Sequence, residues 1–244
     1  MKNRIGETYY NKRNEKYTII EQESSMIVTI KFDDESILEN VFYNNVKKGE
    51  IKNPYFKTVY GVGFIGVGRH LSSVKGTTTK AYTTWVNMLR RCYYEKTQNI
   101  FPTYKGVITC EEWHNFQNFA EWYEENYAEA FFIDKDIICK DCRIYSPETC
   151  CFVPNEINML FVKSNSTRGK YLIGVHKIKN RYVSQLNKNG EVIFLGSFIT
   201  EVEAFQVYKT AKELWIKEVA DKWQGKITEE CYQAMYKYEV EITD

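Results

Sequence analysis

Short runs in which apolar and polar residues alternate dominate the first part of the chain. Residues 17–21, 26–32 and 37–42 have this period of two, which is typical of half-buried β-strands, and polar turns separate them. We therefore expect a small twisted sheet or barrel over residues 1–58. The segment carries no recognisable chemistry, so we expect it to serve packing or dimerisation.

Helical spacing replaces this pattern from residue 79 onward. Apolar residues recur every three or four positions, which predicts amphipathic helices over residues 79–93 and 113–127. The two apolar stripes consist of Tyr82, Trp85, Leu89 and Cys92 and of Phe116, Phe119, Tyr123 and Tyr127. Arg90 and Arg91 close the first helix, where they favour the helix dipole and are well placed to contact phosphate.

The last third of the chain returns to alternation and then to helix. Two alternating runs after residue 174 flank the Asn189-Gly190 pair, which is typical of a tight hairpin. Thr200 and Glu203 have the spacing of a capping box, which predicts the start of a long amphipathic helix. A three-stranded sheet followed by helices is the expected result.

A glycine-rich segment precedes the first helix. Gly61, Gly63 and Gly66 have the GxGxxG spacing of nucleotide-binding loops. A dinucleotide site needs a helix directly after the glycines, whereas residues 72–79 are rich in Ser, Thr and Gly. We expect a linker or a close approach of the backbone, for example to a nucleic-acid phosphate, in place of nucleotide binding.

Length and composition support several packed modules. The chain has 244 residues, 43% of them hydrophobic, with 19 Tyr, 14 Phe and 5 Trp, which excludes a disordered protein. The patterns predict an α+β, multi-domain fold. Its segments are a small β-rich module over 1–58, a helical and strand–strand–helix domain over 59–163, and a three-stranded sheet with helices over 164–244.

Charge is unevenly distributed although the formal net charge is only +1. Residues 61–110 hold seven basic residues and one acidic residue, and residues 163–190 hold seven and none. Residues 111–136 hold eight acidic residues and one basic residue. This order suggests phosphate-binding surfaces around a site for a divalent cation, with ordinary solvated faces as the alternative.

The most informative stretch runs from residue 133 to 163. An apolar strand ends at Asp134, a polar tip and a Ser-Pro-Glu-Thr turn at 146–149 follow, and a second strand leads into a helix that Pro154 opens. This order resembles the ββα finger of HNH nucleases. The likeness is carried by Asp134 with Ile137, by the turn, which stands where the family has Asp-Pro-Glu-Asn, and by Asn158 on the helix.

A wider resemblance covers roughly residues 60–163. The chain is similar there to a group of bacteriophage proteins described as HNH homing endonucleases. The shared segments are AYTTWVNMLRRCY, PTY, CEEWHNFQNF, DKDI, YSPETC and VPNEIN.

This resemblance implies a metal-dependent hydrolase. Asp134 matches the metal-binding Asp of the family and Asn158 matches its ligand on the helix, so that Asp134, Asp136 and Asn158 would hold Mg²⁺ or Mn²⁺ through oxygen atoms. Lys135 stands where the family has its general-base His. Lysine is a poor base at neutral pH, and Asp136 is the alternative base. Because Lys135 replaces this His, the chain is either an active nuclease or an inactive DNA-binding scaffold, and both alternatives are kept.

Zinc is a separate question. Cys139 and Cys142 have the CxxC spacing of a zinc knuckle, and Cys110 with His114 would complete a Cys₃His set. Simple buried or exposed thiols are the alternative. Seven Cys is an odd number, which favours a reduced, cytoplasmic chain over a disulfide framework.

The C-terminal segment resembles the DNA-binding domain of plant ethylene-response factors. The likeness is carried by Gly-Val at 174–175, by Leu-Gly-Ser-Phe at 195–198 and by the helix that Thr200 opens. Such a domain lays its sheet in the major groove of DNA. The strand residues that this resemblance assigns to the contact are His176, Lys177, Lys179, Arg181, Tyr182, Gln185, Asn187 and Phe194, with fewer guanidinium groups than that family uses to read guanine.

Three functions follow as hypotheses. The first is a phage-type HNH-like endonuclease that nicks or cleaves double-stranded DNA in the cytoplasm of a bacterial host. The second is a catalytically inactive DNA-binding regulator or anti-defence factor on the same scaffold. The third is a module that binds an acidic protein partner. The chain has neither an apolar leader nor a run of 18 apolar residues, so we expect no membrane association.

Overall fold

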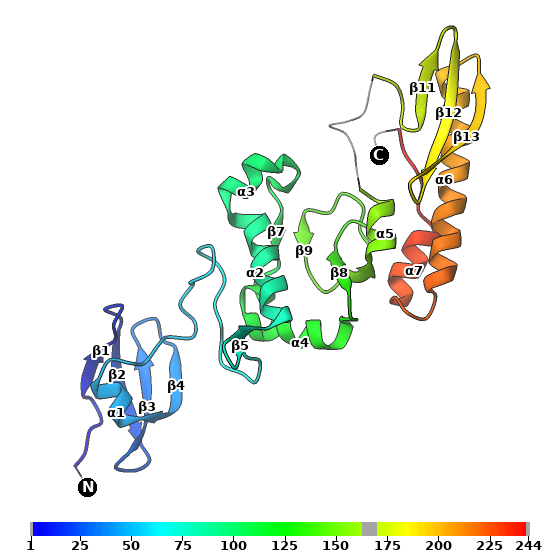
Figure 1. Cartoon of the computed structure of the whole chain (residues 1–244). Coiled ribbons are helices and arrows are strands. Elements are labelled where there is room, and N and C mark those ends of the chain that lie inside the picture. Colours follow the sequence, from blue (N-terminus) through cyan, green and yellow to red (C-terminus); the bar gives the residue numbers. More distant parts are fainter. Residues whose placement is uncertain (1, 163–169, 243–244) are drawn as a thin grey trace. The chain divides into compact units, whose positions relative to one another are not determined.

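The structure is a computed structural model that describes residues 2–162 and 170–242. It contains helices and several separate sheets, which confirms the predicted α+β class (Figure 1). The chain forms two compact units: the first holds the residues up to 101 together with 111–121, and the second holds 102–110 together with the chain from 122 onward.

A four-stranded antiparallel sheet begins the first unit, with its strands in sequence order. They are β1 (Thr8–Tyr10), β2 (Lys16–Gln22), β3 (Ile27–Phe32) and β4 (Ile37–Phe42), and the short helix α1 (Tyr43–Lys47) follows. Because side chains alternate along each strand, one face carries most of the apolar residues. The core of this module consists of Tyr17, Ile19, Val28, Ile30, Phe32, Val41 and Val46. The predicted β-rich module is therefore present.

The glycine-rich segment packs against side chains of its own unit. A Cβ atom on Gly63 would lie 2.5 Å from Leu89 Cδ1 and 2.9 Å from the Trp85 ring. Gly66 has a φ of +72°, a conformation that glycine adopts at little cost, and a Cβ there would overlap Asn115. The expected close approach of the backbone is present, and its neighbours are these side chains.

Helices complete the first unit. The remaining elements are the hairpin β5 (Ser73–Val74) and β6 (Thr77–Thr78), α2 (Lys80–Tyr93), α3 (Glu95–Ile100), a 3₁₀ turn over Glu111–His114, and the start of α4 (Phe116–Asn126). Thr79 caps α2, because its Oγ1 accepts the Tyr82 N–H at 3.3 Å. The predicted second helix is shorter than expected, since the residues before Phe116 form the 3₁₀ turn.

The second unit contains the predicted strand–strand–helix element. Strand β8 (Phe131–Asp134) pairs in antiparallel fashion with β10 (Cys151–Pro154), and α5 (Asn155–Leu160) follows β10 directly. Asp134 lies opposite Cys151 in this register. Smaller elements of the same unit are a 3₁₀ turn over Pro102–Tyr104 and the parallel pair β7 (Ile108–Thr109) and β9 (Ile144–Tyr145).

The C-terminal sheet has three antiparallel strands backed by a long helix (Figure 1). Asn189 and Gly190 have φ values of 57° and 88°, which form the predicted tight hairpin. The predicted capping box is also present, since Glu203 N–H donates to Thr200 Oγ1 and Thr200 N–H donates to the Glu203 carboxylate. The elements are β11 (Val175–Ile178), β12 (Arg181–Lys188), β13 (Glu191–Phe198), α6 (Glu201–Trp223) and α7 (Glu229–Tyr236).

One hydrophobic core joins the strand–strand–helix element to the C-terminal sheet. Its buried residues include Val153 and Ile157 from the former, Leu186 from the sheet, and Phe205 and Ile216 from the helix α6 that backs the sheet. A polar link adds to it, because the carboxylate of Glu156 on α5 accepts hydrogen bonds from Lys222 and Trp223 at 2.7 and 2.8 Å. The polar stretch over residues 164–169, for which the sequence suggests a linker, lies outside the described residues. The three-segment division stays a prediction.

Candidate functional site

Asp134 forms the turn that ends strand β8. Its Oδ1 accepts the backbone N–H groups of Asp136 and Ile137 at 2.8 and 3.0 Å. This Asx-type turn takes the chain out of the strand, so Asp136 lies in the turn. In a longer strand, Asp134 and Asp136 would point to the same face. Because β8 ends at Asp134, the two carboxylates do not share a strand face.

The surroundings of Asp134 disfavour its charge. Burial of the carboxyl, and then the nearby Asp136 carboxylate, raise the pKa of Asp134 above its ordinary value. The two backbone N–H groups and Lys135 act in the opposite direction. A divalent cation beside Asp134 would reverse this balance, because it would stabilise the carboxylate.

Lys135 is enclosed by the loop that follows the strand. Only 7% of the residue is exposed, and its Nζ donates to Asp136 Oδ1 at 2.5 Å and to the Cys142 carbonyl at 2.9 Å. Its ammonium group thus holds the turn and the loop together. These partners give Lys135 a structural task at the position where the resembled family has its base.

Asn158, the third expected metal ligand, lies on α5, and this helix packs against β8. The side chains of Asp134, Asp136 and Asn158 offer oxygen atoms, which are the ligands that Mg²⁺ prefers. Within residues 2–162 and 170–242, no group of three or more His, Cys, Asp and Glu side chains is arranged to hold a metal ion. The donor chemistry fits a hard cation, although one Asp134 oxygen and one Asp136 oxygen already accept hydrogen bonds.

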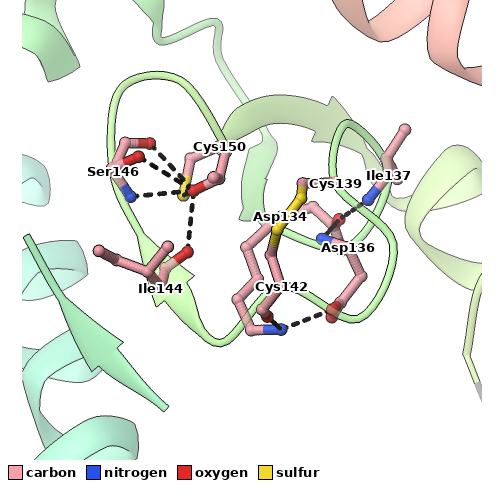
Figure 2. Close-up of a disulfide and its surroundings, with 10 residues drawn as sticks. Asp134, Asp136, Ile137, Cys139, Cys142, Ile144, Ser146 and Cys150 are labelled. Atoms are coloured by element: carbon pink, nitrogen blue, oxygen red, sulfur yellow. Dashed lines mark hydrogen bonds and ion pairs between the residues drawn. A yellow bond between two sulfur atoms is a disulfide. The ribbon is translucent and has the colours of Figure 1, made fainter.

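Cys139 and Cys142 form a disulfide in the loop between β8 and β9, and Figure 2 shows it beside Asp134 and Asp136. The expectation of free thiols is wrong for this pair. The expected zinc set would need both sulfur atoms as thiolates, which the disulfide form does not supply. The other cysteines, which form no disulfide, are Cys92, Cys110, Cys150, Cys151 and Cys231.

His114 was the remaining member of the expected zinc set. Its Nε2 lies 3.2 Å from the Tyr93 hydroxyl. Burial, and then the charge of Lys57, lower the pKa of His114, so its ring is neutral at neutral pH. Cys110 belongs to the second unit and His114 to the first. Zinc binding stays a prediction without support from this arrangement.

Strand register assigns the residues of the C-terminal sheet to its two faces. Leu186 is buried against α6, and Lys188 pairs with Glu218 of that helix at 2.5 Å. Side chains alternate along β12, so Gln185 and Asn187 point to the opposite face. Cross-strand partners share a face, which places His176 and Phe194 there as well. We call this the helix-free face; its predicted DNA-contacting residues are His176, Arg181, Gln185, Asn187 and Phe194.

Three of the predicted contact residues lie elsewhere. Lys177 and Tyr182 are register partners on the helix side of the sheet, and the Lys177 ammonium lies 4.9 Å from the centre of the Tyr182 ring. Lys179 lies in the turn between β11 and β12, with a φ of 52°. The resemblance placed all eight residues on one contact surface. Strand alternation and the turn place only five of them on the helix-free face.

Among the side chains of the helix-free face, Arg181 carries a formal charge and none is acidic. Arg181 is exposed, and its guanidinium donates to the Ser197 hydroxyl and carbonyl at 3.3 and 2.7 Å. Asn187 Oδ1 accepts the Gly190 N–H at 2.9 Å and so fixes the hairpin. Phe194 is 67% exposed. The strand residues that alternate onto this face are His176, Ile178, Arg181, Val183, Gln185, Asn187, Val192, Phe194 and Ser197, among which no acidic residue occurs.

Arg90 and Arg91 lie in the last turn of α2, as predicted, and Arg90 is exposed. They belong to the first unit, whereas the helix-free face belongs to the second. The predicted helix dipole contact is consistent with their position.

One polar cluster of the first unit escaped the sequence analysis. Glu121 accepts a hydrogen bond from Arg69 at 2.9 Å, and its other oxygen lies 2.9 Å from His70 Nε2. The His70 contact, followed by that of Arg69, lowers the pKa of Glu121. These residues are about 50 positions apart in the chain, and no motif in the sequence connects them.

Comparison with known proteins adds no assignment: no family model, curated protein or solved structure matches the chain.

Within the described residues, no helix combines the length and the apolar character needed to cross a membrane.

Proposed function

We propose that this chain binds double-stranded DNA through the helix-free face of its C-terminal sheet. One observation carries the proposal: five of the eight contact residues expected from sequence lie on one sheet face that has no acidic side chain, and three of them, Arg181, Asn187 and Phe194, are exposed. A two-stranded ribbon fits the major groove, and cationic groups around it favour approach to phosphate. Residues 170–190 hold five Lys and Arg residues and no Asp or Glu.

Fluorescence anisotropy with a labelled duplex tests this proposal. Affinity should fall steeply as salt rises, because phosphate contacts release counterions. Replacing Arg181 by Ala should weaken binding to all sequences and reduce the salt slope by about one. Lys237→Ala is the matched control, since this exposed residue ends α7 and changes the net charge equally. Absence of affinity for any duplex at low salt would instead favour an acidic protein partner.

Metal-dependent phosphodiester hydrolysis is a second candidate function. It is favoured by the β8–β10–α5 order, in which Asp134 ends the first strand and Asn158 lies on the helix that packs against that strand. Asp134, Asp136 and Asn158 would hold Mg²⁺ or Mn²⁺, which when bound would supply positive charge to the scissile phosphate. Lys135 would keep the loop in place. An inactive DNA-binding regulator is the alternative on the same scaffold.

Nicking of supercoiled plasmid and of genomic DNA separates these two. An active enzyme should cut in Mg²⁺ or Mn²⁺ and stop in EDTA. Asp134→Asn and Asn158→Ala should each lower the cleavage rate at least about a hundredfold while DNA binding persists. Asp134→Asn is preferred to Ala because an amide oxygen can still accept the two backbone N–H groups of the turn. DNA binding without cleavage in either metal would support the regulator.

A further inference from the structure

Carboxamide and apolar side chains lie side by side on the helix-free face. In the register of β12 and β13, Gln185 is opposite Phe194 and Asn187 is opposite Val192. Directly opposite residues of antiparallel strands have Cβ atoms about 4.5–5.5 Å apart. The face therefore presents two neighbouring pairs, each made of one amide group and one hydrocarbon group.

Three of these four side chains are exposed, and Gln185 is half-buried. Phe194 is 67% exposed and Val192 is 59% exposed. Leu195, which a bulge in the β12–β13 register leaves without a strand partner, packs against the core of the unit. Phe194 lies opposite Gln185 and is therefore on the face that Gln185 occupies. Within the described residues, the Gln185 carboxamide has no hydrogen-bond partner. It is free to bind a ligand without breaking a contact of the sheet.

The guanidinium group on this face is partly engaged. Arg181 binds Ser197 through Nε and one Nη, so one of its two donor edges is occupied and the edge formed by the two Nη atoms stays open. Asn187 Oδ1 accepts the Gly190 N–H, which leaves its amide hydrogens as donors. Asn187 is thus tied to the hairpin through its oxygen, whereas the Gln185 carboxamide has both its donor and its acceptor groups without a partner within the described residues.

The major-groove edge of an A·T pair matches this arrangement. Adenine offers the N7 acceptor and the N6 donor, which a Gln carboxamide pairs with in bidentate fashion, and thymine offers a methyl group. Building on the proposed DNA binding, we propose that the helix-free face recognises A·T base pairs in the major groove. Gln185 reads adenine, Phe194 contacts a thymine methyl group, and Val192 supplies a second apolar contact.

Selection from a randomised duplex pool with the full chain tests the inference without a known target. The enriched sequences should share A·T pairs, and enrichment of G·C pairs at the bound positions would overturn it. The selected duplex is then remade with uracil for thymine, which removes only the methyl group, and separately with 7-deazaadenine, which removes only N7. We expect affinity to fall about fourfold and roughly tenfold, respectively.

Single variants assign these losses to residues. Phe194→Ala should bind the thymine and uracil duplexes equally, and Gln185→Ala should bind the adenine and 7-deazaadenine duplexes equally. Phe194→Leu keeps an apolar side chain and should retain part of the methyl preference. Lys237→Ala should retain both preferences.

The binding experiments distinguish a failure of A·T recognition from a failure of DNA binding itself. A chain that binds duplex DNA with salt dependence but ignores both base modifications would contradict A·T recognition alone. Absence of binding to every duplex would contradict the proposed function and this inference together.

Discussion

Asp134 combines a turn-forming role with a charge that its surroundings disfavour. The carboxyl accepts two backbone N–H groups, yet burial and Asp136 raise its pKa. Such perturbed carboxyl groups are frequent at functional sites and also in purely structural turns. Lys135 is equally informative, because its burial and its two hydrogen bonds explain a lysine at this position without a catalytic role.

Replacing Asp134 separates the two properties. Because its folded-state pKa is raised, the proton is bound more tightly in the native state, and stability is lost as pH rises from about 4 through that pKa. Asparagine does not ionise, so Asp134→Asn removes this loss. In urea unfolding at pH 7 the variant should be at least as stable as the parent protein. The difference in their free energies of unfolding should become smaller toward pH 4. Asp134→Ala also loses the turn hydrogen bonds and should be destabilised by about 1–3 kcal/mol. Equal destabilisation by Asn and Ala at pH 7 would contradict this account.

At the scale of elements, the loop after β8 is where local sequence signals and structure differ most. The hairpin at Asn189-Gly190 and the capping box at Thr200 were predictable because turn and cap chemistry depend on adjacent residues. The disulfide of Cys139 and Cys142 was not, since the CxxC spacing serves zinc, disulfides and free thiols alike. The His70–Glu121 contact was also out of reach, because it depends on tertiary packing.

Thiol titration tests the loop directly. The structure has five free cysteines and one disulfide, so the denatured, unreduced chain should show five reactive thiols and the reduced chain seven. The disulfide closes a loop of four residues. By the chain-entropy relation, its reduction should lower the free energy of unfolding by about 2 kcal/mol. The Cys139→Ser, Cys142→Ser double variant should unfold identically with and without reductant. Seven thiols before reduction would contradict the disulfide.

At the scale of the molecule, the strand–strand–helix element and the C-terminal sheet belong to one unit with one core. Sequence patterns predicted both elements but gave no sign that they share a core. The reason is physical: periodicity reveals which face of an element is apolar, and it does not reveal which distant element covers that face. In a nuclease, this shared core would hold the metal-binding strand at a fixed offset from the DNA-binding face.

Ile157→Ala tests the shared core. Ile157 is fully buried on α5, and its truncation should cost about 2–5 kcal/mol. Hydrogen exchange should show β10 and β12 losing protection by similar amounts. Met159→Ala on the same helix is the control, because Met159 is 59% exposed and should change stability by less than about 0.5 kcal/mol. Loss of protection confined to β10 would indicate two independent cores.

The most direct test of the central claim is photocrosslinking to a labelled duplex with p-benzoylphenylalanine at Phe194 or at Leu214. Both positions are exposed and apolar, 67% and 59%, but Phe194 lies on the helix-free face and Leu214 lies on α6. We expect a crosslink at position 194 that weakens as salt rises, and none at position 214. Equal crosslinking at both positions, or crosslinking at position 214 alone, would contradict DNA binding by the helix-free face.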